Sequence, residues 1–88
     1  MISSGGLGAA LQAYQRAVAL QNDFADGWNN LAQVALELGQ LNVAGDAIDR
    51  AVGLGGVRLA QYLHLQAEIA RLRAQPTAPA WPVQTAPQ

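Results

Sequence analysis

Two apolar periodic segments joined by a glycine decide the fold, and residues 28–51 contain most of both: WNNLAQVALELGQLNVAGDAIDRA. In the first segment, apolar residues recur three or four positions apart, the spacing of one helix face: Trp28, Leu31, Ala32, Ala35 and Leu38. The second segment repeats this spacing with Leu41, Ala44, Ile48, Ala51 and Val52. Gly39 between them is the kind of residue that ends a helix in a left-handed conformation. The stretch therefore predicts two helices with a turn at Gly39.

Two further helical segments flank this pair. The first starts near Leu7, where Ser3 or Ser4 can cap it, and its apolar stripe is Leu7, Ala10, Leu11, Tyr14, Ala17 and Val18. The last runs from about Val57 to Ala74, with Leu59, Tyr62, Leu65, Ile69 and Leu72 facing inward. Asp23 is the expected N-cap of the second helix, and Gly53, Gly55 and Gly56 are expected to end the third. The fold class is all-α, with four helices.

A proline-rich segment follows the helices. All four prolines fall after residue 75, and residues 75–88 favour extended, polyproline-like conformations. We interpret this segment as a linker or extended tail. Trp81 is the one residue in it suited to anchor a contact.

The chain matches itself when it is shifted by 34 residues. The identities include Gly5/Gly39, Leu7/Leu41, Ala10/Ala44, Ala13/Ala47, Arg16/Arg50, Ala17/Ala51, Val18/Val52, Leu20/Leu54, Leu31/Leu65 and Leu38/Leu72, and Trp28 meets Tyr62. A period of 34 residues with two helices in each unit is typical of tetratricopeptide (TPR) arrays. Residues 25–58 resemble one complete TPR, because Trp28-x2-Leu31-Ala32 matches its opening motif and Ala44, Ile48 and Ala51 match the second helix.

Three positions depart from the family pattern, namely Ala35, Ile48 and Gly56 in place of a tyrosine, an aromatic residue and a closing proline. The resemblance divides residues 1–74 into a half repeat (5–24), a whole repeat (25–58) and a second half repeat (59–74), followed by the tail 75–88. It implies an antiparallel helix-turn-helix solenoid with open ends.

The resemblance also implies a function, which is to hold a peptide or helix of a partner protein on the concave surface formed by the first helix of each repeat. The expected groove residues are Asn29, Asn30, Gln33, Leu36, Glu37, Leu63, His64, Ala67 and Arg71. Asn30 stands where many TPRs place an asparagine whose amide can pair with a peptide backbone. Clamping of a C-terminal carboxylate is rejected, because Ala60 and His64 replace the basic pair of that TPR subtype.

An alternative function is self-assembly through the terminal helix faces. The residues expected on those faces are Leu7, Leu11 and Tyr14 at one end and Tyr62, Ile69 and Leu72 at the other. Exposed apolar faces of this kind tend to be covered by another molecule. A third possibility is that the tail around Trp81 occupies the groove of the same or a neighbouring copy.

Composition argues against other functions. The net charge is −1, so neither nucleic acid nor an anionic membrane is expected as a partner. Lysine and cysteine are absent, and His64 is the only histidine, so we expect no phosphate loop, no metal site and no cofactor. No catalytic constellation occurs, and the chain is expected not to be an enzyme. Without a signal peptide or a membrane-length apolar run, the expected location is cytoplasmic, unless the chain is a segment of a larger exported protein.

Overall fold

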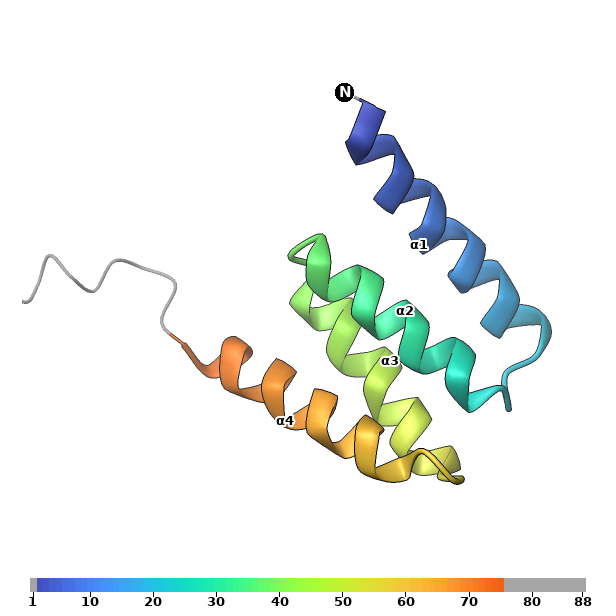
Figure 1. Ribbon diagram of the computed structural model, residues 1–88, viewed down its shortest axis with the longest axis vertical. Helices are drawn as coiled ribbons and strands as arrows, with labels where there is room; N and C mark the ends of the chain where they lie inside the picture. The colour runs from blue at the N-terminus through green and yellow to red at the C-terminus, as the bar shows by residue number, and fades with distance from the viewer. Residues whose placement is uncertain (1, 76–88) are drawn as a thin grey trace, which may run out of the picture.

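The chain forms an array of four helices, seen here in a computed structural model that describes residues 2–75. They are α1 (Ile2–Leu20), α2 (Ala25–Glu37), α3 (Leu41–Leu54) and α4 (Leu59–Ala74) (Figure 1). No strand occurs in the described range. The all-α prediction is therefore confirmed. The extended tail and Trp81 were predicted for residues that, apart from Gln75, lie outside this range.

Consecutive helices run antiparallel. The turns after α1 and α3 lie at one end of the array, and the turn after α2 lies at the other (Figure 1). The pair α2 and α3 occupies the middle, with α1 packed on α2 and α4 packed on α3. The order is that of a helical solenoid, in which each element contacts its neighbours in sequence.

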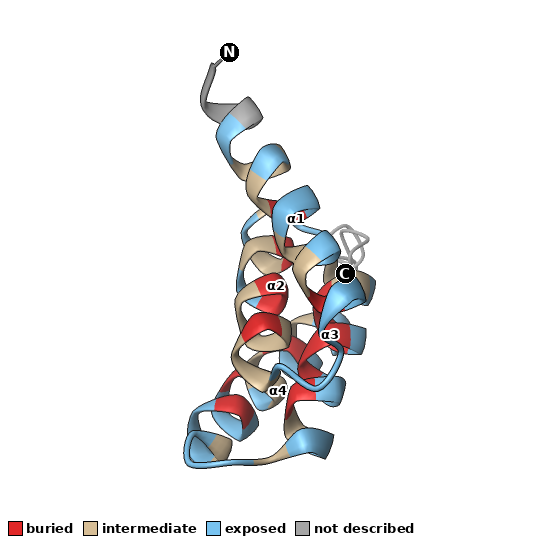
Figure 2. Ribbon diagram, turned by 90° about the vertical axis from the view of Figure 1, so that its right-hand side faces the viewer, coloured by how far each residue is buried: buried red, intermediate tan, exposed pale blue. Residues whose placement is uncertain are grey.

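The core is built mainly from small residues. Ala32 and Ala35 on α2 face Ala44, Ala47 and Ala51 on α3, and each has at most 1% of its surface exposed. Small side chains at facing positions let two helices approach closely, so that larger residues fill the remaining space. The other buried apolar residues are Leu11, Val18, Leu31, Ile48, Tyr62, Leu65 and Ile69. Figure 2 shows these buried segments facing inward along all four helices.

The turn between α2 and α3 is formed as predicted. Gly39 has φ +80°, in the left-handed region. Its N–H donates to the carbonyl of Leu36 at 3.0 Å, and the N–H of Gln40 donates to the carbonyl of Ala35 at 2.8 Å. These two hydrogen bonds are those of a Schellman motif, which satisfies the last carbonyls of a helix.

Several predicted helix boundaries are wrong. Because α1 begins at Ile2, Ser3 and Ser4 lie inside the helix instead of capping it. The N-cap of α2 is Phe24, without a side-chain cap, since the chain turns through residues 21–24 and leaves Asp23 within the turn.

α3 ends at Leu54, before Gly55 (φ +72°) and Gly56 (φ +110°), so Gly53, which was expected to help end it, lies inside the helix. The break before α4 is longer than predicted. α4 then begins at Leu59, two residues later than Val57. Helix ends depend on these local hydrogen bonds, which apolar periodicity does not report. The division into whole and half repeats stays a prediction.

Candidate functional site

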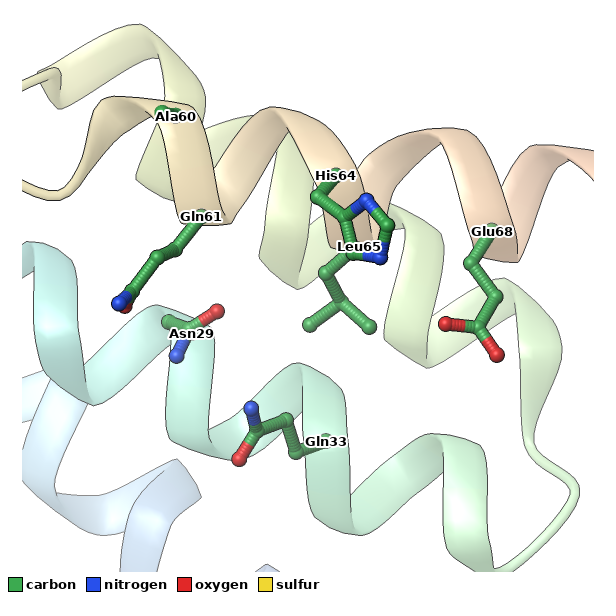
Figure 3. Close-up of a pocket in the computed structure, with 7 residues that line it drawn as sticks. All are labelled: Asn29, Gln33, Ala60, Gln61, His64, Leu65 and Glu68. Atoms are coloured by element: carbon green, nitrogen blue, oxygen red, sulfur yellow. The ribbon is translucent and has the colours of Figure 1, made fainter.

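A hollow of about 590 Å³ lies between α2 and α4, the first helices of successive predicted repeats. The residues that line it are Asn29 and Gln33 on α2 and Ala60, Gln61, His64, Leu65 and Glu68 on α4 (Figure 3). The α2 residues are four apart, and the α4 residues are spaced three or four apart along most of the face. Each set therefore occupies one helix face.

A second hollow, of about 370 Å³, continues along α4. It is lined by His64, Ala67, Glu68 and Arg71. Because His64 and Glu68 line both hollows, the two adjoin, and we call them together the α2/α4 groove, although the second hollow is lined by α4 residues alone.

The groove is rich in amide side chains. Gln61, on α4, extends toward Asn29 on α2, and Gln33 lies one turn farther along α2 (Figure 3); each of the three carries both a hydrogen-bond donor and an acceptor. Leu65, which is only 9% exposed, forms the apolar floor of the groove. Glu68 and Arg71 carry opposite charges, and His64 is the one other ionisable side chain that lines the groove, so its charges nearly balance. Such a lining can read polar backbone groups without demanding a charged ligand.

Five of the predicted groove residues line the two hollows: Asn29, Gln33, His64, Ala67 and Arg71. Four others, Asn30, Leu36, Glu37 and Leu63, line neither. Leu36 packs against the core, and Leu63 is 45% exposed one helical step away from His64. Four lining residues were not predicted, Ala60, Gln61, Leu65 and Glu68. Helical spacing from His64, at three and four residues on either side, could have found Gln61, Ala60 and Glu68.

Asp26 fastens the beginning of α4 to the beginning of α2. Its carboxylate accepts a hydrogen bond from Arg58 Nη1 at 2.7 Å, and a second from the hydroxyl of Tyr62. Burial raises the pKa of Tyr62 above its usual value, and the hydrogen bond and negative charge of Asp26 act in the same direction. The neutral phenol is therefore the form that holds α4 in place and sets one end of the groove.

The rest of α4 is held against α3. The side chain of Gln66 donates to Asp49 at 2.8 Å. Farther along, the guanidinium of Arg73 lies directly over Gly45, where a β-carbon would collide with it. These contacts lie away from the groove residues and fix the direction of the helix that carries them.

Trp28 is a structural residue of α2. Its Nε1–H donates to the carbonyl of Asn22 at 2.8 Å, which closes the turn between α1 and α2. The guanidinium of Arg50, on α3, lies 4.6 Å from the centre of its ring, within the range of a cation–π interaction. Trp28 thus joins α2 to α3 and to the turn after α1, and it does not line the groove.

The residues predicted for self-association are less exposed than the sequence suggested. Tyr62 and Ile69 are only 2% and 1% exposed, and Leu11 is 9% exposed, so these three do not lie on open faces. The reason is that α4 buries them against α2 and α3, and α1 buries Leu11 against the core. Leu7, Tyr14 and Leu72 are half-buried. Large apolar side chains that are exposed among the described residues lie elsewhere: Leu20, Phe24, Leu54, Val57 and Leu63.

The described part of the chain was compared with the requirements of a metal site and of a membrane-spanning helix. Residues 2–75 bring no three histidine or acidic side chains together in a way suited to a metal ion. Within the same range, every helix is too short or too polar to cross a membrane.

Antiparallel helices that pack in sequence order, with a groove between one helix and the next but one, define the helical-repeat class of proteins. Comparison with family models narrows this class, since the TPR repeat model matches residues 2–39, which include α1, α2 and the turn to Gly39. The helical array agrees with this match, which covers 38 of the 88 residues and supports a fragment of the TPR family. Comparison with curated proteins gave no match, and comparison with solved structures gave none.

The matched segment pairs α1 with α2, whereas the 34-residue period pairs α2 with α3 in the predicted whole repeat, 25–58. In a periodic array of helices a unit can be counted from either helix. The two divisions therefore describe the same succession of elements.

Proposed function

We propose that this chain is a protein-interaction module whose α2/α4 groove binds an extended peptide segment of a partner protein. TPR repeats generally mediate protein–protein interaction and are typically non-enzymatic scaffolds. The single observation that carries the proposal is the set of three amide side chains that line the groove, Asn29 and Gln33 from α2 and Gln61 from α4 (Figure 3).

The chemistry of these amides favours an extended peptide over a helix. A helix has already paired its backbone N–H and C=O groups internally, apart from those at its ends. An extended segment keeps both kinds of group free along its length. Asn and Gln side chains can donate to one and accept from the other, so they gain most from an extended ligand.

The charge of the groove narrows the ligand further. Glu68 and Arg71 lie three residues apart on α4, and His64 is the one other ionisable side chain that lines the groove. A strongly acidic or strongly basic peptide would find one attractive and one repulsive partner. The expected ligand is therefore a peptide of low net charge, with an apolar side chain to cover Leu65.

The test is selection of peptides from a random library on the full chain, followed by calorimetric titration of the selected peptides. We expect Asn29→Ala and Gln33→Ala each to weaken binding roughly fivefold, since a neutral hydrogen bond contributes about 1 kcal/mol net. Gln12→Ala is the matched control, because Gln12 is an exposed amide on α1, outside the α2/α4 groove. Equal loss in the control, or no loss in the two groove variants, would refute the proposal.

Self-assembly through the terminal helices stays a second prediction, which we rank lower. The burial of Leu11, Tyr62 and Ile69 removes three of the residues on which it depended. Sedimentation equilibrium over a wide range of concentration tests it, and a mass that stays at 9.2 kDa would exclude it.

A further inference from the structure

We propose that in the free chain the α2/α4 groove is occupied by the chain's own residues 76–88, which bind it in cis and compete with partner peptides. This inference rests on the proposed function, because it names the first ligand of the same groove. It is carried by three observations: where α4 ends, how much chain follows, and the match between the chemistry of that chain and the lining of the groove.

The geometry of α4 brings the tail to the mouth of the groove. Arg71, the last groove residue, lies one helical turn before Gln75, where the helix has ended and the backbone is extended (ψ 139°). From Ala74 back to Gln61 the groove runs 13 residues along the helix, or about 20 Å. Residues 76–88 are 13 residues long and span up to about 43 Å when extended. The segment is long enough to reverse direction and still follow the groove to its far end.

Trp81 has the reach to enter the near half of the groove. Six residues, Pro76 to Trp81, span up to about 20 Å when extended. A tight turn takes about four of them, so about two remain to run back along α4, or about 7 Å. Arg71 and Ala67, which line the second hollow, lie about 5 Å and about 10 Å back from Ala74 along α4. An indole at this position would lie over Arg71 and reach Ala67.

The composition of the tail complements the groove. Residues 76–88 contain no ionisable side chain, which suits a groove whose charges nearly balance. Four of the 13 are prolines, which lack an N–H, and proline-rich sequences favour a conformation without internal hydrogen bonds. The segment therefore offers free carbonyl acceptors. The side-chain amides of Asn29, Gln33 and Gln61 are donors that can meet them.

Covalent attachment makes even weak binding effective. A short flexible tether gives a local concentration on the order of 1 mM. If the free tail peptide bound with a dissociation constant of about 0.1 mM, the groove would be about 90% occupied by the tail. A partner peptide would then bind roughly tenfold more weakly to the chain than to a variant whose tail cannot dock. The tail would set a threshold of affinity that a partner must exceed.

A paramagnetic label on the tail tests the proposal in the full chain. No native cysteine is present, so Gln84→Cys gives one attachment site for a nitroxide. We expect the nitroxide to reduce by at least half the side-chain amide NMR signals of Asn29, Gln33 and Gln61. The signal of Gln12, which lies on α1 across α2 from α4, should change little (Figure 1). Adding Trp81→Ala to the labelled chain should restore most of the lost signal.

A mixing experiment distinguishes docking of the tail in cis from docking of a neighbouring copy's tail. In a mixture of nitroxide-bearing chain and isotope-labelled chain without nitroxide, groove signals should stay unchanged. Loss of signal there would mean that a neighbouring copy supplies the tail, which overturns docking in cis. Equal broadening of Gln12 and the groove amides, or none at all, also overturns it.

A peptide selected in the library experiment separates this inference from the proposed function. We expect it to bind Trp81→Ala several-fold more tightly than the parent chain. Equal affinities would refute competition by the tail while leaving the groove function intact. Failure of every peptide to bind either chain would refute both.

Discussion

The substitution Ala32→Gln tests how α2 and α3 are packed, with Gln66→Ala as its counterpart. The two positions are equivalent in the 34-residue period, yet their surroundings differ. Ala32 is fully buried between helices, whereas Gln66 is half-buried on α4 and donates to Asp49 at 2.8 Å. The period alone would predict similar tolerance, but the structure predicts opposite outcomes.

The expected magnitudes follow from burial. A glutamine at position 32 adds four heavy atoms, a methylene carbon and a carboxamide, to a site with no exposed surface, and overpacking alone destabilises by about 1–3 kcal/mol. The buried amide, left without a partner, adds about 1–3 kcal/mol. The sum, about 2–6 kcal/mol, approaches the whole stability of a small domain. Gln66→Ala should change the free energy of unfolding by less than about 1 kcal/mol, because it loses one exposed hydrogen bond and gains helix propensity.

Urea unfolding followed by circular dichroism measures both variants against the parent chain. We expect Ala32→Gln to lower the midpoint strongly or to prevent folding, and Gln66→Ala to leave it nearly unchanged. Ala32→Ser provides a smaller change at the same site for the case in which the glutamine variant does not fold, and it should still lose about 1 kcal/mol or more. If Ala32→Gln unfolds within 1 kcal/mol of the parent with the same dependence on urea, the close packing of α2 on α3 described above is wrong.

Three further changes probe the turn, the α2–α4 link and Trp28. Gly39→Ala should lower the free energy of unfolding by about 1–2 kcal/mol, because φ +80° disfavours a β-carbon; thermal melting measures it, with exposed Gly6→Ala as control. The contribution of Tyr62 to the free energy of unfolding should be complete below the pKa of tyrosine in the unfolded chain, near 10.0. It should be lost as pH rises through the raised pKa of Tyr62 in the folded chain. Urea midpoints from pH 8 to 11 should therefore fall less steeply in Tyr62→Phe, and equal slopes would contradict this. Arg50→Ala should destabilise by about 0.5–1 kcal/mol and shift Trp28 fluorescence, whereas Arg16→Ala, at the equivalent position of α1, should do neither.

Local sequence was sufficient to predict the helices and the turn at Gly39. Apolar spacing located all four helices, because the side chains that a helix buries recur with the helical repeat. Gly39 was predictable because few residues other than glycine adopt φ near +80°. The starts of α1, α2 and α4 were not predicted correctly. At α2 and α4 the reason is that the capping residues, Phe24 and Arg58, make no side-chain cap and are not of the types expected at a cap.

The membership of the groove was predictable only in part. Family pattern named Asn29, Gln33 and His64, because it supplies the helix face that lines a concave surface. It missed Gln61 and Glu68 and included Leu63, one step of 100° away around α4. Which face of α4 meets α2 depends on the rotation of that helix. Asp26, through Arg58 and Tyr62, and Asp49, through Gln66, hold this rotation by contacts between residues 17 to 36 positions apart.

The sequence by itself determined a TPR-type succession of helices, because helical period, small residues and a glycine turn are local properties repeated every 34 residues. Tertiary structure alone decided that Tyr62 and Ile69 are core residues and that Asn29, Gln61 and Glu68 share one groove. The physical reason is that burial and concavity arise between helices. They depend on how closely alanine faces let α2 and α3 approach, and on the long-range contacts that orient α4.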